Sequence, residues 1–134
     1  MAKVYYTSFE TQMGLSMLQK LKTLLKKGGF EESFQKDKLV ALKIHFGEYG
    51  NLAYIRPNYL RVIVDMVKEN GGKPFLTDAN TLYKGSRANA VDHLKTALVN
   101  GFAYPTVDAP LVIADGLRGT DEVKIPLNGE FIKE

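Results

Sequence analysis

The sequence predicts an α/β fold: a three-layer sandwich in which helices cover both faces of a mainly parallel sheet, with a C-terminal β-hairpin. Short apolar segments alternate with amphipathic segments of helical periodicity, a pattern typical of parallel sheets. Glycine follows each amphipathic segment, as is common where a helix ends. Near the C-terminus, polar and apolar residues alternate around Asn128-Gly129, a strong hairpin turn. We expect an α/β core domain over residues 1–118 and an appended hairpin over residues 119–134.

The expected strands are short and rich in aliphatic or β-branched residues; they span residues 3–7, 39–46, 74–78 and 110–114. The second is the most strand-like, because Lys43 and His45 are its only polar residues. Right-handed crossovers place the carboxyl ends of parallel strands on one edge of the sheet. The polar residues that follow these strands should therefore lie close together.

Two helices are expected before residue 74. The first begins after Ser16, whose spacing to Gln19 fits a capping box, and it ends at Gly28. The second begins at Pro57, because proline suits the first helical position. Its apolar positions recur at helical spacing and should face the core; they are Leu60, Val64 and Val67.

A third helix is expected from an N-cap at Ser86 through Asn100. His93 lies at the edge of its apolar stripe and is expected to be a half-buried packing residue. The stripe itself should be buried; it contains Ala90 or Val91, together with Leu94, Ala97 and Leu98.

Composition limits the classes of function. The 134 residues fit one domain, and 45% hydrophobic with 25% charged residues is typical of a soluble globular protein. No apolar run could cross a bilayer and the start lacks a signal peptide's apolar stretch, so we expect a cytoplasmic protein without membrane contact. The net charge of +3 comes partly from lysines of the first helix, but no aromatic residues alternate with them. Nucleic-acid binding is therefore disfavoured.

Polar residues follow three of the expected strands. His45 and Glu48 follow one strand, and Asp115 ends another. Asp78 ends the strand between them and is followed by Asn80 and Thr81. In open α/β sheets, ligands bind at the carboxyl ends of the strands. We therefore expect a small-molecule site at this edge.

Two kinds of chemistry fit these residue types. His45 with Glu48 could perform acid–base catalysis, because imidazole titrates nearest neutral pH. Alternatively, His45, Asp78 and Asp115 could hold a divalent metal ion. The structural alternative is that the aspartates cap loops and His45 is hydrogen-bonded at the sheet edge. The sequence does not identify a cofactor.

A second candidate feature precedes the third helix. Lys84, Ser86 and Arg87 lie at its expected N-terminus, where exposed N–H groups and the helix dipole attract anions. These residues could bind the phosphate or carboxylate of an anionic small molecule. The alternative is a capped helix with solvated cations.

Five segments of the chain carry a family resemblance: KIHFGE at residues 43–48, YIRP at 54–57, LTDANTLY at 76–83, NAVDHL at 89–94 and IADGL at 113–117. Together they resemble the amino-terminal part of the prokaryotic "domain of unknown function 362" family. The resemblance implies that some members carry a ferredoxin-like C-terminal portion whose cysteines bind iron–sulfur clusters. This chain contains no cysteine, so these residues hold no iron–sulfur cluster.

Two hypotheses of different classes follow. The first is a small-molecule or metal-binding domain, with a catalytic version in which His45 is the acid–base group. The second is a non-catalytic scaffold that packs against a redox module in a longer parent protein. A hairpin so close to the C-terminus predicts a longer parent protein, with or without a redox module, and the uncovered apolar face of the hairpin predicts self-association.

Overall fold

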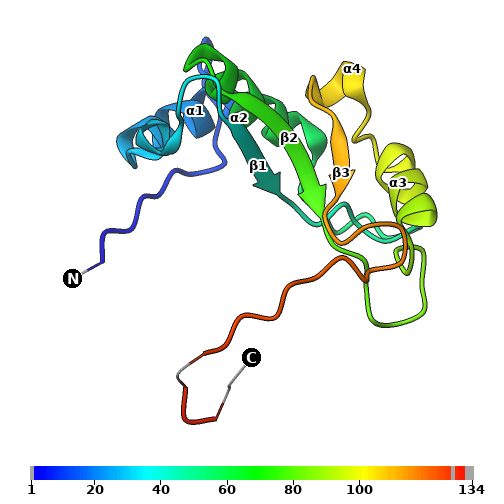
Figure 1. Cartoon of the computed structure of the whole chain (residues 1–134). Helices are drawn as coiled ribbons and strands as arrows, with labels where there is room; N and C mark the ends of the chain where they lie inside the picture. Colours follow the sequence, from blue (N-terminus) through cyan, green and yellow to red (C-terminus); the bar gives the residue numbers. More distant parts are fainter. Residues whose placement is uncertain (1, 128, 132–134) are drawn as a thin grey trace.

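The structure is a computed structural model that describes residues 2–127 and 129–131. Its centre is a three-stranded parallel sheet in the order β1-β2-β3 (Figure 1). The strands are β1 (Leu39–Lys43), β2 (Lys73–Asp78) and β3 (Leu111–Ile113). Lys43 lies opposite Thr77, and Asp78 lies opposite Ile113, so the carboxyl ends of the strands share one edge. The predicted α/β fold and the parallel pairing of these strands are confirmed.

The helices are α1 (Met17–Lys27) and the 3-10 helix η1 (Phe30–Ser33) before the first strand, α2 (Pro57–Glu69) between β1 and β2, and α3 (Ala90–Val99) and α4 (Tyr104–Val107) between β2 and β3. Helix α2 packs against β2 and contacts both α1 and α4, whereas α3 contacts β3. The predicted capping box is confirmed, because Ser16 Oγ accepts from the Gln19 N–H and Gln19 Oε1 accepts from the Ser16 N–H. Pro57 opens α2 as predicted. No helix in the described part of the chain is long and apolar enough to cross a membrane.

The core lies between α2, the sheet and the segments around α3. The predicted stripe of α2 is confirmed, because Leu60, Val64 and Val67 are buried against Leu76 of β2. Beyond the carboxyl edge of the sheet, Phe46 and Phe102 are fully buried, with their ring centroids 5.2 Å apart. These two rings extend the core beneath the loops that carry the polar residues.

The predicted strand at residues 3–7 is wrong. Residues 2–7 form no strand, and Val4 is 90% exposed. The Nζ atom of Lys20 donates to the carbonyl oxygens of Ser8 and Glu10, which ties the N-terminal segment to α1 rather than to the sheet. In Figure 1 the beginning of the chain accordingly runs away from β1.

The predicted C-terminal hairpin is not formed in the described part of the chain. Residues 119–127 contain no strand, and the segment after β3 runs away from the sheet (Figure 1). The turn residue Asn128 and residues 132–134 lie outside the described residues. Two short arms give only a marginal hairpin in water unless another surface covers them. Val123 and Ile125 are exposed, and self-association through this segment stays a prediction.

The third helix begins later than predicted. Its N-cap is Asn89, whose side chain accepts from the Asp92 N–H. The hydroxyl of Ser86, the predicted N-cap, donates instead to Glu48 Oε2. Of the predicted buried face, Ala90 and Ala97 are buried and Leu94 packs against the core, as predicted. Leu98 is exposed, contrary to the prediction, and His93 is fully rather than half buried. The buried face of α3 includes His93 because the His93 side chain lies against Asp78 at the end of β2.

Candidate functional site

Asp78, the last residue of β2, is the centre of a buried ionic cluster. Its carboxylate is 5% exposed. Oδ1 lies 2.8 Å from the Nζ of Lys43 at the end of β1 and accepts the Ala79 N–H at 3.0 Å. Oδ2 accepts from Arg87 Nη1 at 3.1 Å. The end of β2 therefore carries a buried carboxylate that is neutralised by two cations of the same chain.

Arg87 connects Asp78 to Glu48, which lies in the loop after β1. The Arg87 side chain is 4% exposed, and its Nε donates to Glu48 Oε1 at 2.7 Å. The hydroxyl of Tyr83 donates to the same oxygen at 2.5 Å, and Ser86 Oγ donates to Oε2 at 2.8 Å. The loops after β1 and β2 are thus joined by one set of charge-assisted hydrogen bonds. We call this set the Arg87 network; its members are Lys43, Glu48, Asp78, Tyr83, Ser86 and Arg87.

His93 lies beside this network and was not expected there. Its side chain is fully buried, and its Nε2 is 3.4 Å from Asp78 Oδ2, which is too long for a well-formed hydrogen bond. Its ring packs against Phe46 in an edge-to-face arrangement, with centroids 5.6 Å apart. Within the described residues, neither ring nitrogen has a hydrogen-bond partner. Helical spacing placed His93 near the apolar stripe, but nothing in that pattern indicated contact with Asp78.

Both carboxylates of the network titrate below their ordinary range. Burial alone would raise the pKa of Asp78, but the approach of His93, the Lys43 ammonium and the Ala79 N–H together lower it. The hydrogen bond from Tyr83 is the main cause that lowers the pKa of Glu48 to about 2, with further hydrogen bonds from Arg87 and Ser86. Both groups are therefore ionised at neutral pH.

These shifts predict acid sensitivity. A carboxylate whose pKa is lower in the folded state stabilises the fold above its unfolded pKa, and this contribution disappears as the pH falls through the folded pKa. For Glu48 the loss should occur between its ordinary value of 4.5 and about 2, and Asp78 should add to it below 3.8. Urea unfolding of the wild type and of Glu48→Gln across this range should show a shallower pH dependence in the variant. Equal slopes would contradict the assignment to Glu48.

A second set of hydrogen bonds joins the loops after β2 and β3. The backbone N–H of Asn80 donates to the Asp115 carboxylate at 3.0 Å, and Asn80 Nδ2 donates to Asp115 Oδ1 at 3.0 Å and to the Gly116 carbonyl oxygen at 2.8 Å. Thr81 forms hydrogen bonds within the loop after β2: its N–H donates to the carbonyl oxygen of Arg87, and its hydroxyl donates to the carbonyl oxygen of Tyr83. Asp115 therefore caps a neighbouring loop.

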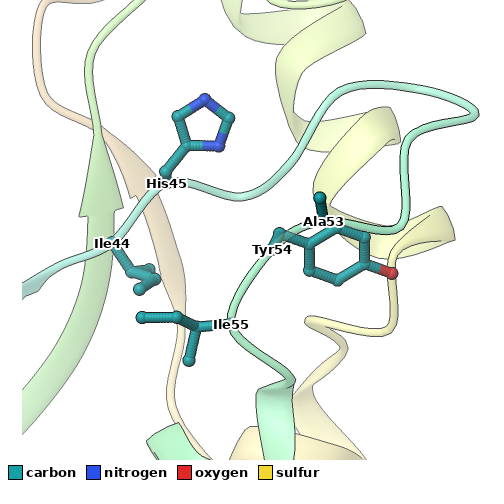
Figure 2. A pocket seen from close by; sticks show the side chains of 5 residues that line it. All are labelled: Ile44, His45, Ala53, Tyr54 and Ile55. Atoms are coloured by element: carbon teal, nitrogen blue, oxygen red, sulfur yellow. The ribbon is translucent and has the colours of Figure 1, made fainter.

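His45 is exposed and stands apart from both sets. Its Nδ1 accepts the Gly47 N–H at 2.9 Å, whereas the Glu48 carboxylate is bonded to Tyr83, Ser86 and Arg87. Among the described residues, the predicted catalytic pair is therefore joined by no hydrogen bond or ion pair. His45 instead lines a pocket of about 440 Å³ with Ala53, Tyr54 and two isoleucines. In Figure 2 Ile44 and Ile55 face each other across the space between two chain segments, and the His45 ring lies on the other side of its backbone.

Lys84, Ser86 and Arg87 do not lie at a helix N-terminus as predicted, since α3 begins at Ala90, and anion binding by these residues stays a prediction. Ser86 and Arg87 face Glu48, and Lys84 is exposed without an ion pair among the described residues. The metal prediction gains no support: in the part of the chain that the structure describes, no group of three His, Cys, Asp or Glu side chains is placed to hold an ion.

Fold and site together define an α/β domain whose polar groups gather at the carboxyl edge of a parallel sheet. Residues 40–134 match the family model described as "Domain of unknown function (DUF362)", and the chain belongs to this family. The family resemblance of the sequence motifs is thereby confirmed; the match does not extend to an iron–sulfur function. Searches of the curated proteins and of the solved structures return no significant match.

Proposed function

We propose that the domain binds a small molecule with a carboxylate or carbonyl group in the pocket beside His45. One observation carries this proposal. Because the Gly47 N–H occupies Nδ1 of His45, the neutral ring carries its proton on Nε2, which is then a hydrogen-bond donor for a ligand at the edge of the pocket, outside the space between Ile44 and Ile55 (Figure 2). Apolar contacts for the body of the ligand come from Ile44, Tyr54 and Ile55.

The walls of this pocket are held in place before a ligand arrives. The Tyr54 hydroxyl donates to the Asn100 carbonyl oxygen at 3.2 Å, and Asn100 Nδ2 donates to the carbonyl oxygen of Phe46 at 2.8 Å. Glu48, in the same loop, is fixed by Arg87. A pocket whose walls are already ordered loses less entropy on binding. The Arg87 network thus positions the pocket rather than contacting the ligand, and a catalytic version of the site would have His45 as its acid–base group.

The scaffold hypothesis is the second candidate, and one observation favours it. The carboxylates of Glu48 and Asp78 are satisfied by donors of this chain, so they need no ligand to explain their burial. In this case the Arg87 network only stabilises a surface on which a redox module packs. The scaffold hypothesis predicts that no small carboxylate binds beside His45.

The two candidates are separated by titrating the protein with benzoate, a probe that combines a carboxylate with an apolar ring. With isoleucine methyl labelling, the NMR signals of Ile44 and Ile55 should shift saturably, and the signal of Ile113 in β3 should not. His45→Phe keeps an aromatic ring but removes the donor. It should weaken binding by roughly tenfold or more, as expected for a lost hydrogen bond to a charged group.

Leu52→Ala is the matched control, because Leu52 is exposed in the same loop and does not line the pocket. It should bind benzoate like the wild type. If benzoate leaves Ile44 and Ile55 unchanged, or if His45→Phe binds it equally well, the proposed site is wrong and the scaffold hypothesis gains.

A further inference from the structure

The two faces of the sheet differ in how they are covered. Leu42, Leu76 and Ile113 lie on the face against which α2 and α3 pack, and they belong to the buried core. Successive strand residues alternate between the faces, so the strand register places four other apolar residues on the opposite side: Leu39, Ala41, Phe75 and Val112. None of these four belongs to the core, and Leu39 and Val112 are 76% and 43% exposed. We call this set the open face.

A partner is expected on the open face, because parallel sheets are normally covered on both sides. The surface is also hollowed there. A pocket of about 350 Å³ lies at the amino ends of the strands, where Leu39 and Phe75 line it together with Pro110 and with Tyr104 of α4. An apolar hollow of this kind can receive an aliphatic side chain of a partner.

We propose that a second copy of the chain covers the open face with its C-terminal arm, and that the exchange is reciprocal. The arm consists of residues 122–127, which run away from the sheet of their own copy (Figure 1). Its apolar residues Val123, Ile125 and Leu127 are 86%, 68% and 50% exposed. Because they occupy alternate positions, an extended arm presents all three on one side, as a strand does when it packs on a sheet. This inference does not depend on the pocket beside His45.

Charge favours the arm over a second open face as the occupant. On the open side of the sheet, the charged residues of β1 and β2 are Lys43 and Lys73, whose side chains are 64% and 61% exposed. Each lies near one carboxylate of its own chain, at 2.8 and 3.9 Å, yet keeps N–H donors for a second one. Two open faces packed together would bring these like charges close. The arm and the residues just beyond it carry two exposed glutamates, Glu122 and Glu130, against the single Lys124, so opposite charges meet in the exchange.

Sedimentation equilibrium of the full chain over a concentration series should show a monomer–dimer equilibrium. Leu39→Lys on the open face and Ile125→Glu on the arm should each weaken the dimer by about tenfold or more, because a charge replaces buried apolar surface and every dimer carries the change twice. The matched control is Leu52→Lys. Leu52 is 85% exposed, much like Leu39, but it lies in the loop after β1, and this variant should associate like the wild type.

A mixture of Leu39→Lys with Ile125→Glu tests whether the exchange is reciprocal. The mixture should form a heterodimer more readily than either variant forms a homodimer, because the intact arm of the first variant fits the intact open face of the second. In a mixed sample of isotope-labelled and unlabelled wild type, isotope-filtered NOEs should connect the Ile125 methyl groups of one copy to the Phe75 ring of the other.

Each other outcome overturns the inference. A strict monomer at the highest soluble concentration excludes the second copy as the partner. If only Leu39→Lys weakens the dimer, two open faces pack together, and if only Ile125→Glu does, two arms pair with each other. A loss in Leu52→Lys as large as that in Leu39→Lys would show that added charge alone, and not the open face, governs association. An NOE between Ile125 and Phe75 within one chain would show that the arm covers its own sheet.

Discussion

Replacing Arg87 by methionine should lower the free energy of unfolding by about 3 to 5 kcal/mol, the range found when one partner of a buried ion pair is removed. The guanidinium is 4% exposed and donates to Asp78, Glu48 and the Tyr83 hydroxyl. Methionine fills a similar volume but leaves two carboxylates without their shared cation. Urea unfolding followed by circular dichroism at neutral pH measures the change.

The matched control for this prediction is Arg61→Met. Arg61 also forms ion pairs with two carboxylates, Asp65 and Asp108, but these pairs lie at the surface and are screened by water. The control should therefore lose much less stability than Arg87→Met. Comparable losses in the two variants would show that the Arg87 network does not stabilise the fold in the way described.

Gly47→Ala should be the second most damaging substitution, at about 2 to 4 kcal/mol. Gly47 has φ +80°, which is unfavourable for a residue with a side chain. A Cβ at this position would lie 2.6 Å from Asn100 Nδ2 and 2.7 Å from the Tyr54 ring. Overpacking of this kind costs about 1 to 3 kcal/mol in addition to the backbone strain. The substitution should also disturb the pocket, because Tyr54 is part of its wall.

Gly50→Ala separates the two causes. Gly50 lies in the same loop with φ +85°, but a Cβ there would meet nothing within 4 Å. It should cost only about 1 kcal/mol, the backbone contribution alone. The measurement is again urea unfolding, with a benzoate titration on each variant. Equal losses at the two glycines would mean that the close packing around Gly47 does not matter.

Local patterns were sufficient to predict much of the fold. The capping box at Ser16 and the proline at the start of α2 each depend only on residues within a few positions of one another, and both are confirmed. The strand at residues 3–7 was wrong because strand formation needs a pairing partner, and Lys20 holds the adjoining residues elsewhere. A strand propensity cannot show which surface a terminal segment reaches.

The candidate site could be predicted only in part. The carboxyl edge was found because each of the aligned strands is followed by polar residues, and the strand register confirms that their ends coincide. The partners of Asp78 were missed. Arg87 looked like a helix N-terminal cation, but the chain folds back after β2 and buries it between two carboxylates. Lys43 was the one partner of Asp78 that the sequence could have indicated, because it is the only charged residue in β1.

The central claim is that His45 carries an N–H donor at the edge of the pocket, and the most direct measurement is a long-range proton–nitrogen NMR correlation of its imidazole. At about pH 8.5, where ordinary imidazole side chains are neutral, the pattern should be that of the Nε2–H tautomer. The His45→Phe variant assigns the signals. Benzoate should then shift the Nε2 resonance more than that of Nδ1, because Nδ1 stays bound to the Gly47 N–H. An Nδ1–H tautomer, or an Nε2 resonance that does not shift when benzoate is added, would contradict the claim.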